Sequence, residues 1–272
     1  MKRFSAYIIS AAAVISCAAA KPRVVSLDYC SDQYVLKLAD PDQIFAVSRG
    51  ADKDYSHMRS AADDHARIRP TPEEVLSLEP DLVLRQWGGG VNAAEAFGRF
   101  GAEVISLGYP DDFEGVEDNI RMAAEALEQP ERGEKLIREM QSRLDALAAQ
   151  NEPTQRALYV TPGGVTAGSH TMIDSILKAA GVINIAAENG EVYWPPLPAE
   201  ALLLNPPKLI VAGFFVSEDQ DINYWSAARH PAIEAQLKET PTVYLTPDLI
   251  SCAAWYAVDA AELIAEKSAE LE

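Results

Sequence analysis

The chain has 272 residues, of which 48% are apolar and 24% charged, as in globular proteins that bury a substantial core. Its 23 basic and 41 acidic residues give a formal charge of -18. So acidic a surface repels phosphate backbones and anionic headgroups, and we therefore expect neither a nucleic-acid partner nor a peripheral membrane role. The one long apolar stretch lies at the N-terminus, so the mature chain is not expected to be an integral membrane protein.

The N-terminus carries the pattern of an export signal. Lys2 and Arg3 are followed by the apolar run AYIISAAAVIS and then by the small residues CAAA. The apolar run is too short to span a bilayer comfortably. We therefore expect residues 1–20 to be a signal peptide that is cleaved after Ala20 and directs the protein to the periplasm. Lipid attachment at Cys17 is the alternative, because VIS before this cysteine suits lipoprotein processing.

Short aliphatic runs then alternate with helical stretches, which predicts an α/β fold with mostly parallel strands. Strands are expected at 23–27, 43–48, 81–87 and 102–107, and helices at 31–39, 71–78 and 92–100. Ser31 is the expected N-cap of the first helix. Thr71, with Glu74 three residues later, predicts a capping box at the start of the second helix.

From residue 112 to residue 150 the helical spacing continues without a strand, and only Gln129-Pro130 interrupts it. This pattern predicts a long helical connector with one break. A second α/β lobe follows the connector. Its apolar runs lie at 156–161, 197–204, 208–215 and 241–246, and its helices are expected near 171–180, near 230–237 and from about 252 to 267.

The predicted fold class is therefore α/β, with two Rossmann-like lobes joined by a single long α-helical connector. Residues 21–111 form the expected N-terminal lobe, 112–150 the connecting helix and 151–272 the C-terminal lobe. Ligands of open α/β sheets bind outside the carboxyl ends of the strands. Two such lobes that face each other predict a ligand cleft between them.

Four segments carry a family resemblance in the right order. They are PRVVSL, EEVLSLEPDLVL (73–84), GSHTMIDSILKAAGVIN (168–184) and WPPLPAEALLLNPPKLIV (194–211). Together they resemble the periplasmic solute-binding proteins of ABC importers that carry ferric siderophores, haem and vitamin B12. The resemblance covers essentially the whole mature chain. It implies a monomer that captures a cobalt- or iron-containing chelate and delivers it to a permease dimer in the inner membrane, with no cofactor or metal of its own.

Three shorter stretches are similar to the vitamin B12-binding branch of this family, namely RQWGGGVN (85–92), VYWP (192–195) and LTPD (245–248). By that likeness Trp87, Trp194 and Asp248 line the cleft. Tyr55, in the loop after the second strand, joins them.

The chain departs from that branch at Arg67 and Val165, where the branch places further aromatic contacts. Vitamin B12 or a related corrinoid is therefore the leading ligand and a ferric siderophore the second. The resemblance also implies one docking glutamate per lobe for the permease. The matching positions are Glu73 and Glu200, although an acidic residue in the first turn of a helix also compensates the helix dipole.

The residues themselves support an aromatic cleft. Trp87 and Trp194 lie beside turn residues at strand or loop ends, Gly88 among them, and indole faces match the flat apolar area of a large chelate. Trp225 is a further candidate, whereas Trp255 is as consistent with the core as with the cleft.

Two cysteines remain after cleavage, in turns that we expect to face the cleft from opposite lobes. Tyr29 and Cys30 follow the first strand, and Cys252 precedes the last helix. We rank three interpretations of the cysteines: small buried residues first, contacts with a ligand second, and an interlobe disulfide third.

His57 and His170 lie in predicted cleft loops and are candidate ligand contacts, although none of the four histidines has the spacing of a dedicated metal site. Arg85 belongs to a local basic set that either pairs with nearby aspartates or neutralises carboxylates or catecholates of a chelate. That set comprises Arg49, Arg67, Arg69 and Arg85.

Motifs of enzyme active sites are missing from the sequence. It contains no GxSxG elbow, no HExxH and no P-loop, and the three glycines at 88–90 do not match GxGxxG. We therefore predict no catalytic residues and binding without chemistry. The alternative from another class is a secreted thiol-dependent enzyme that uses Cys30 or Cys252.

Overall fold

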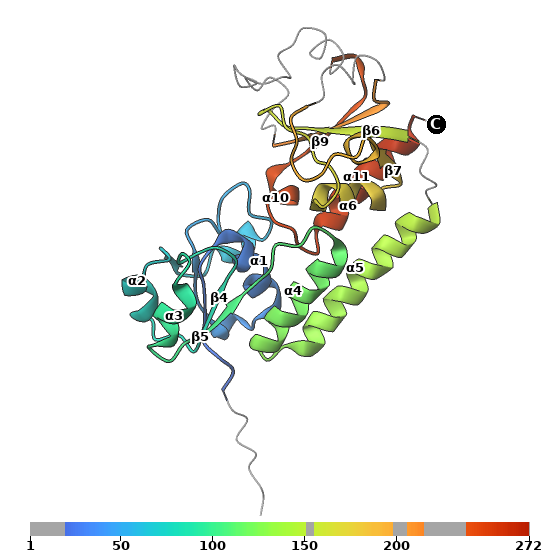
Figure 1. Cartoon of the computed structure of the whole chain (residues 1–272). Coiled ribbons are helices and arrows are strands. Elements are labelled where there is room, and N and C mark those ends of the chain that lie inside the picture. The colour runs from blue at the N-terminus through green and yellow to red at the C-terminus, as the bar shows by residue number, and fades with distance from the viewer. Residues whose placement is uncertain (1–19, 151–154, 198–205, 215–237, 272) are drawn as a thin grey trace, which may run out of the picture.

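The computed structural model describes residues 20–150, 155–197, 206–214 and 238–271 (Figure 1). The expected signal peptide therefore lies outside the described residues except for Ala20. In these ranges no helix combines the length and the apolar character that a membrane crossing requires. Figure 1 shows two α/β lobes, and the predicted two-lobed fold class is confirmed.

Five parallel strands form the sheet of the N-terminal lobe. They are β1 (Val24–Ser26), β2 (Ile44–Ser48), β3 (Arg67–Ile68), β4 (Leu82–Arg85) and β5 (Glu103–Ser106), in the order β3-β2-β1-β4-β5. The helices are α1 (Tyr29–Leu38), α2 (Pro72–Leu76), α3 (Ala93–Gly98) and α4 (Phe113–Ala126), with 3-10 helices at Pro41–Gln43 and Arg59–Ala62. Every strand and helix predicted for this lobe is present. Strand β3 was not predicted, because two residues are too few to show a period.

The two predicted helix caps have different outcomes. Asp28, not Ser31, is the N-cap of α1: its Oδ1 accepts from the Ser31 N–H at 2.9 Å, and the Ser31 hydroxyl accepts from the Asp28 N–H at 3.3 Å. Thr71 caps α2 as predicted, accepting from the Glu74 N–H at 3.4 Å. The Glu74 carboxylate instead accepts from the Arg69 N–H at 2.7 Å, so it does not close the predicted capping box.

The connector contains two helices that reverse direction at the predicted break. Helix α4 packs against α1 in the core of the N-terminal lobe, and α5 (Pro130–Gln150) returns alongside α4 to reach the second lobe (Figure 1). A Cβ atom at Gly133 would lie 2.6 Å from Ala124 Cβ, so glycine permits this close approach of the two helices. Of the two connector helices, α5 is therefore the one that runs from the N-terminal lobe to the C-terminal lobe.

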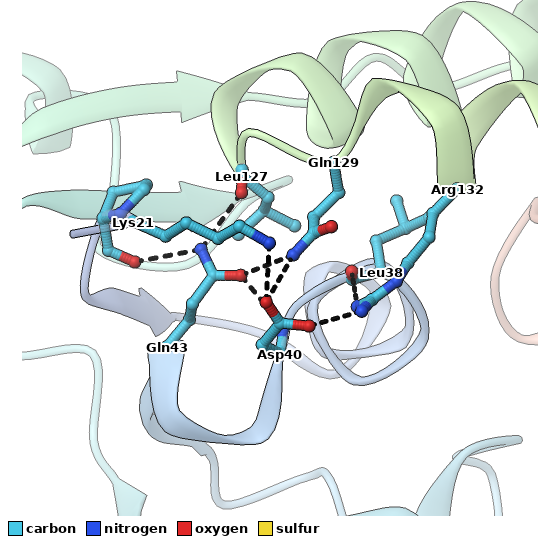
Figure 2. Close-up of polar contacts among 8 residues, drawn as sticks. Lys21, Leu38, Asp40, Gln43, Leu127, Gln129 and Arg132 are labelled. Atoms are coloured by element: carbon cyan, nitrogen blue, oxygen red, sulfur yellow. Dashed lines mark hydrogen bonds and ion pairs between the residues drawn. The ribbon is translucent and has the colours of Figure 1, made fainter. Parts of the chain in front are cut away.

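A polar cluster holds this reversal against the N-terminal segment (Figure 2). Asp40 accepts from the Lys21 ammonium at 2.6 Å and from the Gln129 amide at 3.0 Å, and it also pairs with Arg132. The Gln43 amide donates to the Leu127 carbonyl at 3.0 Å, at the end of α4. Hydrogen bonds from Lys21 and Arg132 hold the pKa of Asp40 well below its ordinary value, so this carboxylate stays charged.

The described part of the C-terminal lobe has a second parallel sheet, in the order β7-β6-β8-β9. Its strands are β6 (Gln155–Val160), β7 (Val182–Asn184), β8 (Leu209–Gly213) and β9 (Thr242–Leu245). Its helices are α6 (Met172–Ala179), α7 (Ile185–Glu188), α10 (Pro247–Ile250) and α11 (Ala257–Ala269). Helix α11 begins five residues after the predicted start at Cys252, because the residues before it turn into the core of the other lobe.

That turn joins the lobes by packing and by a covalent bond. Cys252, Trp255 and Tyr256 lie in one apolar cluster with residues of α1, α4 and α5. Tyr34 of α1 packs edge-on against Trp255, and its hydroxyl donates to the Ala253 carbonyl at 3.1 Å. A disulfide joins Cys30 to Cys252, with their Cα atoms 5.5 Å apart. The C-terminal lobe is therefore anchored in the core of the N-terminal lobe.

Candidate functional site

The carboxyl ends of the two sheets meet at the disulfide. Cys30 follows β1 by four residues, and Cys252 follows β9 by seven. Strands within each sheet are parallel, so all their carboxyl ends lie on one edge. The loops that follow the strands of one lobe therefore face those of the other, and they hold most of the predicted site residues.

An aromatic pocket lies on the N-terminal side of this junction. Tyr29 follows β1, Tyr55 follows β2 and Trp87 follows β4. The ring centroid of Tyr29 lies 4.6 Å from that of Tyr55 and 4.9 Å from that of Trp87. These three rings line a pocket of about 340 Å³, and Arg49 and Arg69 also line it. The structure thus brings together three predicted site residues from three different loops.

Asp28 positions the loop that carries Trp87. Its carboxylate is buried, and Oδ2 accepts from the backbone N–H groups of Gln86, Trp87 and Gly88 at 2.7, 3.0 and 2.9 Å. An anion that receives three consecutive N–H donors holds a loop in one conformation. The sequence analysis did not identify Asp28. An acidic residue directly between a strand and a helix was the available signal.

Asp32, one turn further along α1, positions the loop after β2. Its carboxylate accepts from the Ser48 N–H at 2.9 Å and from the Ser48 hydroxyl at 2.6 Å, and the Gly50 N–H donates to that hydroxyl oxygen. Burial raises the pKa of Asp32 to about 7. A Cβ atom at Gly50 would lie 2.9 Å from Tyr29 Cβ, so this loop closes tightly on the aromatic pocket.

Gly88 and Arg85 shape the turn beside Trp87. A Cβ atom at position 88 would lie 2.5 Å from both Cβ and the carbonyl oxygen of Leu27, so only glycine fits. The Arg85 Nε–H donates to the Gly88 carbonyl at 2.6 Å. Gly88 lines the pocket as predicted, but Arg85 does not. The Arg85 side chain supports the turn through the Gly88 carbonyl, and its predicted contact with a ligand stays a prediction.

On the C-terminal side, Trp194 is 52% exposed and lies edge-on to Tyr159, with the ring centroids 6.3 Å apart. Trp87 is 38% exposed, so neither indole is buried in the core of its own lobe. The Tyr159 hydroxyl is buried beneath Gly213, where a Cβ atom would lie 2.1 Å from it. Tyr159 therefore supports Trp194 from below, in a space that exists only because residue 213 is glycine.

Three large side chains of this lobe have left-handed backbone conformations. His170, Tyr193 and Phe214 have φ values of 59°, 56° and 63°. Each such conformation costs on the order of 1–3 kcal/mol and is typically held in place at functional sites. His170 and Tyr193 lie 5.9 Å apart between ring centroids, and all three side chains are exposed. His170 was predicted from the sequence as a site residue, whereas Tyr193 and Phe214 were not.

Two of the polar contacts that cross between the lobes involve predicted site residues, Asp248 and His170. Arg59 Nη1 donates to Asp248 Oδ2 at 3.2 Å, so the predicted ligand contact Asp248 is engaged by the opposite lobe. Burial raises the pKa of Asp248, but hydrogen bonds from Thr246 and Arg59 outweigh it and leave the pKa below its ordinary value. His170 Nδ1 lies 3.7 Å from Asp111 Oδ2, which places this histidine at the interlobe face.

The cysteine ranking is wrong. Cys30 and Cys252 are not separate buried thiols and do not offer thiols to a ligand, because each sulfur is bonded to the other and both residues are buried. The alternative of a thiol-dependent enzyme loses its nucleophile for the same reason.

His57, predicted as a ligand contact, does not line the aromatic pocket. Its ring stacks on Tyr256 at 3.9 Å, and it lines a different pocket, beside α5. The loop that carries it folds back over α1, where the Gln33 side chain bonds to Ser56 and Met58.

Two predicted residues, Glu200 and Trp225, lie outside the described residues. Glu73 is exposed in the first turn of α2, where a docking residue has to be accessible. Across the described ranges, no group of three or more His, Cys, Asp or Glu side chains is arranged to hold a metal ion.

Comparison with known proteins agrees with the fold. The family model described as periplasmic binding protein matches residues 24–247. A cobalamin-binding protein of Halobacterium salinarum is 27% identical over 204 residues, which is 73% of this chain and 55% of the relative, so the chain spans about half that relative's length.

Solved structures of similar fold include two proteins of Vibrio cholerae. The periplasmic haem-binding protein HutB superposes with a TM-score of 0.73 at 19% identity, covering 90% of this chain and 97% of that one. The periplasmic vitamin B12-binding protein BtuF superposes with a TM-score of 0.66 at 21% identity, covering 92% and 98%.

Two parallel-sheet lobes, facing through the carboxyl ends of their strands and bridged by a long helix, are the fold that this chain shares with these solved periplasmic binding proteins. The match over residues 24–247 shows that the chain belongs to the periplasmic binding protein family.

Proposed function

We propose that this protein is the solute-binding component of an ABC importer and binds a flat metal chelate between the aromatic pocket and the C-terminal lobe. A cobalamin-type corrinoid is the leading ligand and a ferric siderophore the second. The observation that carries the proposal is the packing of Tyr29, Tyr55 and Trp87 around one pocket at the carboxyl edge of the sheet. The metal arrives within the ligand, as cargo.

The size and chemistry of the pocket support a large ligand. At about 340 Å³ the pocket is near the lower limit for sites that enclose a whole drug-sized molecule, so it suits one face of a larger one. Exposed Trp194 and Tyr193 offer apolar area on the opposite lobe. The Arg49 guanidinium lines the pocket and suits a phosphate or carboxylate on the edge of the chelate.

A preorganised site suits a binding protein that performs no chemistry. The disulfide and the Arg59–Asp248 pair hold the lobes together, and Asp28 and Asp32 fix the loops of the pocket. Rigid loops lower the ordering cost of binding. We therefore propose binding without turnover. The related protein of Halobacterium salinarum, described as cobalamin-binding, supports a corrinoid as the first ligand to test.

The proposal places the mature protein in the periplasm as a monomer that docks on a permease dimer through Glu73 and Glu200. Reversing both charges should reduce uptake in cells and leave ligand affinity unchanged. If affinity falls as well, the two glutamates belong to the fold or the pocket and the docking proposal fails. Glu79→Arg is the matched control, because Glu79 is exposed but lies beyond the C-terminal end of α2.

Equilibrium dialysis of the purified protein against cyanocobalamin and a ferric hydroxamate tests the ligand. We expect retention of cyanocobalamin with quenching of tryptophan fluorescence. Trp87→Ala should weaken binding by about thirtyfold, the loss of one aromatic anchor. Phe100→Ala is the matched control, since Phe100 is 72% exposed and does not line the pocket. Retention of the hydroxamate alone would favour the siderophore, and retention of neither would refute the proposal.

A further inference from the structure

A second and larger pocket lies on the α5 side of the molecule, beyond the disulfide from the aromatic pocket. Its volume is about 670 Å³, and α1, α5, the start of α11 and the loop that carries His57 line it. We call it the helix pocket. The proposed chelate site does not use it: of the residues that line the aromatic pocket, none lines the helix pocket.

The helix pocket is basic in a strongly acidic protein. Lys37 enters it from α1, and Lys135, Arg138 and Arg143 from α5, whereas Glu139 and Asp259 are its acidic residues. This lining has a formal charge of +2 in a chain whose formal charge is -18. The local positive charge is therefore opposite to the field of the whole protein.

The acidic residues of the helix pocket are paired with two of its four cations, Arg143 and Lys135. Asp259 pairs with Arg143, which also binds Glu262 at 2.5 Å, and Glu139 lies 3.7 Å from Lys135. In the described chain neither Lys37 nor Arg138 has an acidic group within 4 Å. The Lys37 ammonium lies 5.8 Å from the centroid of the Trp255 ring, at the edge of the pocket.

The wall of the pocket carries further unused polar groups. His57 Nδ1 is buried and has no hydrogen-bond partner within the ranges that the structure covers. The Ser142 hydroxyl also lines the pocket. Buried polar atoms are normally satisfied, so the wall of the helix pocket has a polar atom, His57 Nδ1, for which the described chain supplies no partner.

We propose that the helix pocket binds a phosphate-type oxyanion through Lys37 and Arg138. A compact anion with several oxygen atoms accepts from a guanidinium and an ammonium at once. The pocket is concave, so it suits a free anion better than a flat membrane surface.

The test follows the ring proton signals of His57 by NMR while inorganic phosphate is titrated into the purified protein at constant ionic strength. His57→Gln assigns the signals. We expect a saturable shift of the His57 signals. Arg138→Gln and Lys37→Gln should each weaken phosphate binding about three- to tenfold, the range for exposed charge pairs and charge-assisted hydrogen bonds.

Arg99→Gln is the matched control, because it removes one positive charge from an exposed position on the far side of the N-terminal lobe. A non-saturable shift, or equal weakening by Arg99→Gln, would overturn the proposal, since either result means diffuse attraction rather than a site.

Vesicles that contain phosphatidylglycerol distinguish the source of the phosphate group. Binding of free phosphate without binding of vesicles identifies a soluble anion, and binding of vesicles alone would overturn the pocket proposal.

Discussion

Reduction of the Cys30–Cys252 bond is the most direct perturbation of the interlobe junction. The bond closes a loop between residues 222 apart, so it removes far more conformational freedom from the unfolded chain than a local bridge would. In the chain-entropy model a loop of this length stabilises the folded state by about 5 kcal/mol at 25 °C. Engineered bridges often deliver less, and we expect a loss of about 2–5 kcal/mol on reduction.

Urea unfolding, followed by far-ultraviolet circular dichroism with and without dithiothreitol, measures this loss. A loss of that size lowers the midpoint by roughly 1 M urea or more, given the usual dependence of stability on urea. The Cys30→Ser/Cys252→Ser double variant is the matched control. It should resemble the reduced protein apart from the cost of two hydroxyl groups in a buried position.

A second consequence concerns binding. Without the covalent link, the lobes are held by helix α5 and by noncovalent contacts such as the Tyr34–Trp255 packing and the Arg59–Asp248 pair. The reduced protein should therefore bind the chelate more weakly while each lobe keeps its secondary structure. Two alkylatable thiols in the unreduced, denatured protein, or an unchanged urea midpoint on reduction, would refute this account of the junction.

Three further predictions concern the aromatic pocket and its supports. Asp28→Asn places an amide against three N–H donors and should destabilise the protein by roughly 2–4 kcal/mol and weaken chelate binding, measured by urea unfolding and dialysis. Gly88→Ala should abolish chelate binding, because its Cβ atom would meet Leu27 at 2.5 Å. Asp32 has a raised folded-state pKa of about 7, so its contribution to stability is fully present below about pH 4 and is lost as the pH rises to about 7. The Asp32→Asn side chain does not titrate, so this loss should be absent from the variant. As the pH rises from about 4 to about 7, the free energy of unfolding of the variant should gain at most about 4 kcal/mol relative to that of the wild type, measured by urea unfolding at each pH.

The first two of these predictions have matched control variants, and the third has a refuting outcome. Asp118→Asn removes an exposed acidic charge on α4 and should change neither stability nor chelate binding. Gly90→Ala adds a Cβ atom where nothing lies within 4 Å, but φ is 78°, so only a modest backbone cost is expected. If Asp32→Asn follows the pH profile of the wild type, the buried carboxyl does not titrate as proposed.

Local features determined much of this protein from the sequence alone. Aliphatic runs and helical periodicity located most of the described elements, because burial on one face of a helix or both faces of a parallel strand produces a regular pattern. The break at Gln129-Pro130 was predictable because proline cannot continue a helix. Trp87 and Trp194 were predicted through resemblance and through their neighbouring turns, and both are exposed at the carboxyl side of their sheets.

Contacts between distant residues required the tertiary structure. The disulfide between Cys30 and Cys252 joins two loops that are 222 residues apart in the sequence. No local sequence pattern predicts that these two loops lie close together in space. Asp28 lies between a strand and a helix in the sequence, but only the fold brings the loop after β4 onto its second carboxylate oxygen. His57 faces the helix pocket because its loop folds back over α1. Periodicity reports which face of an element is buried, whereas packing alone decides which partner covers that face.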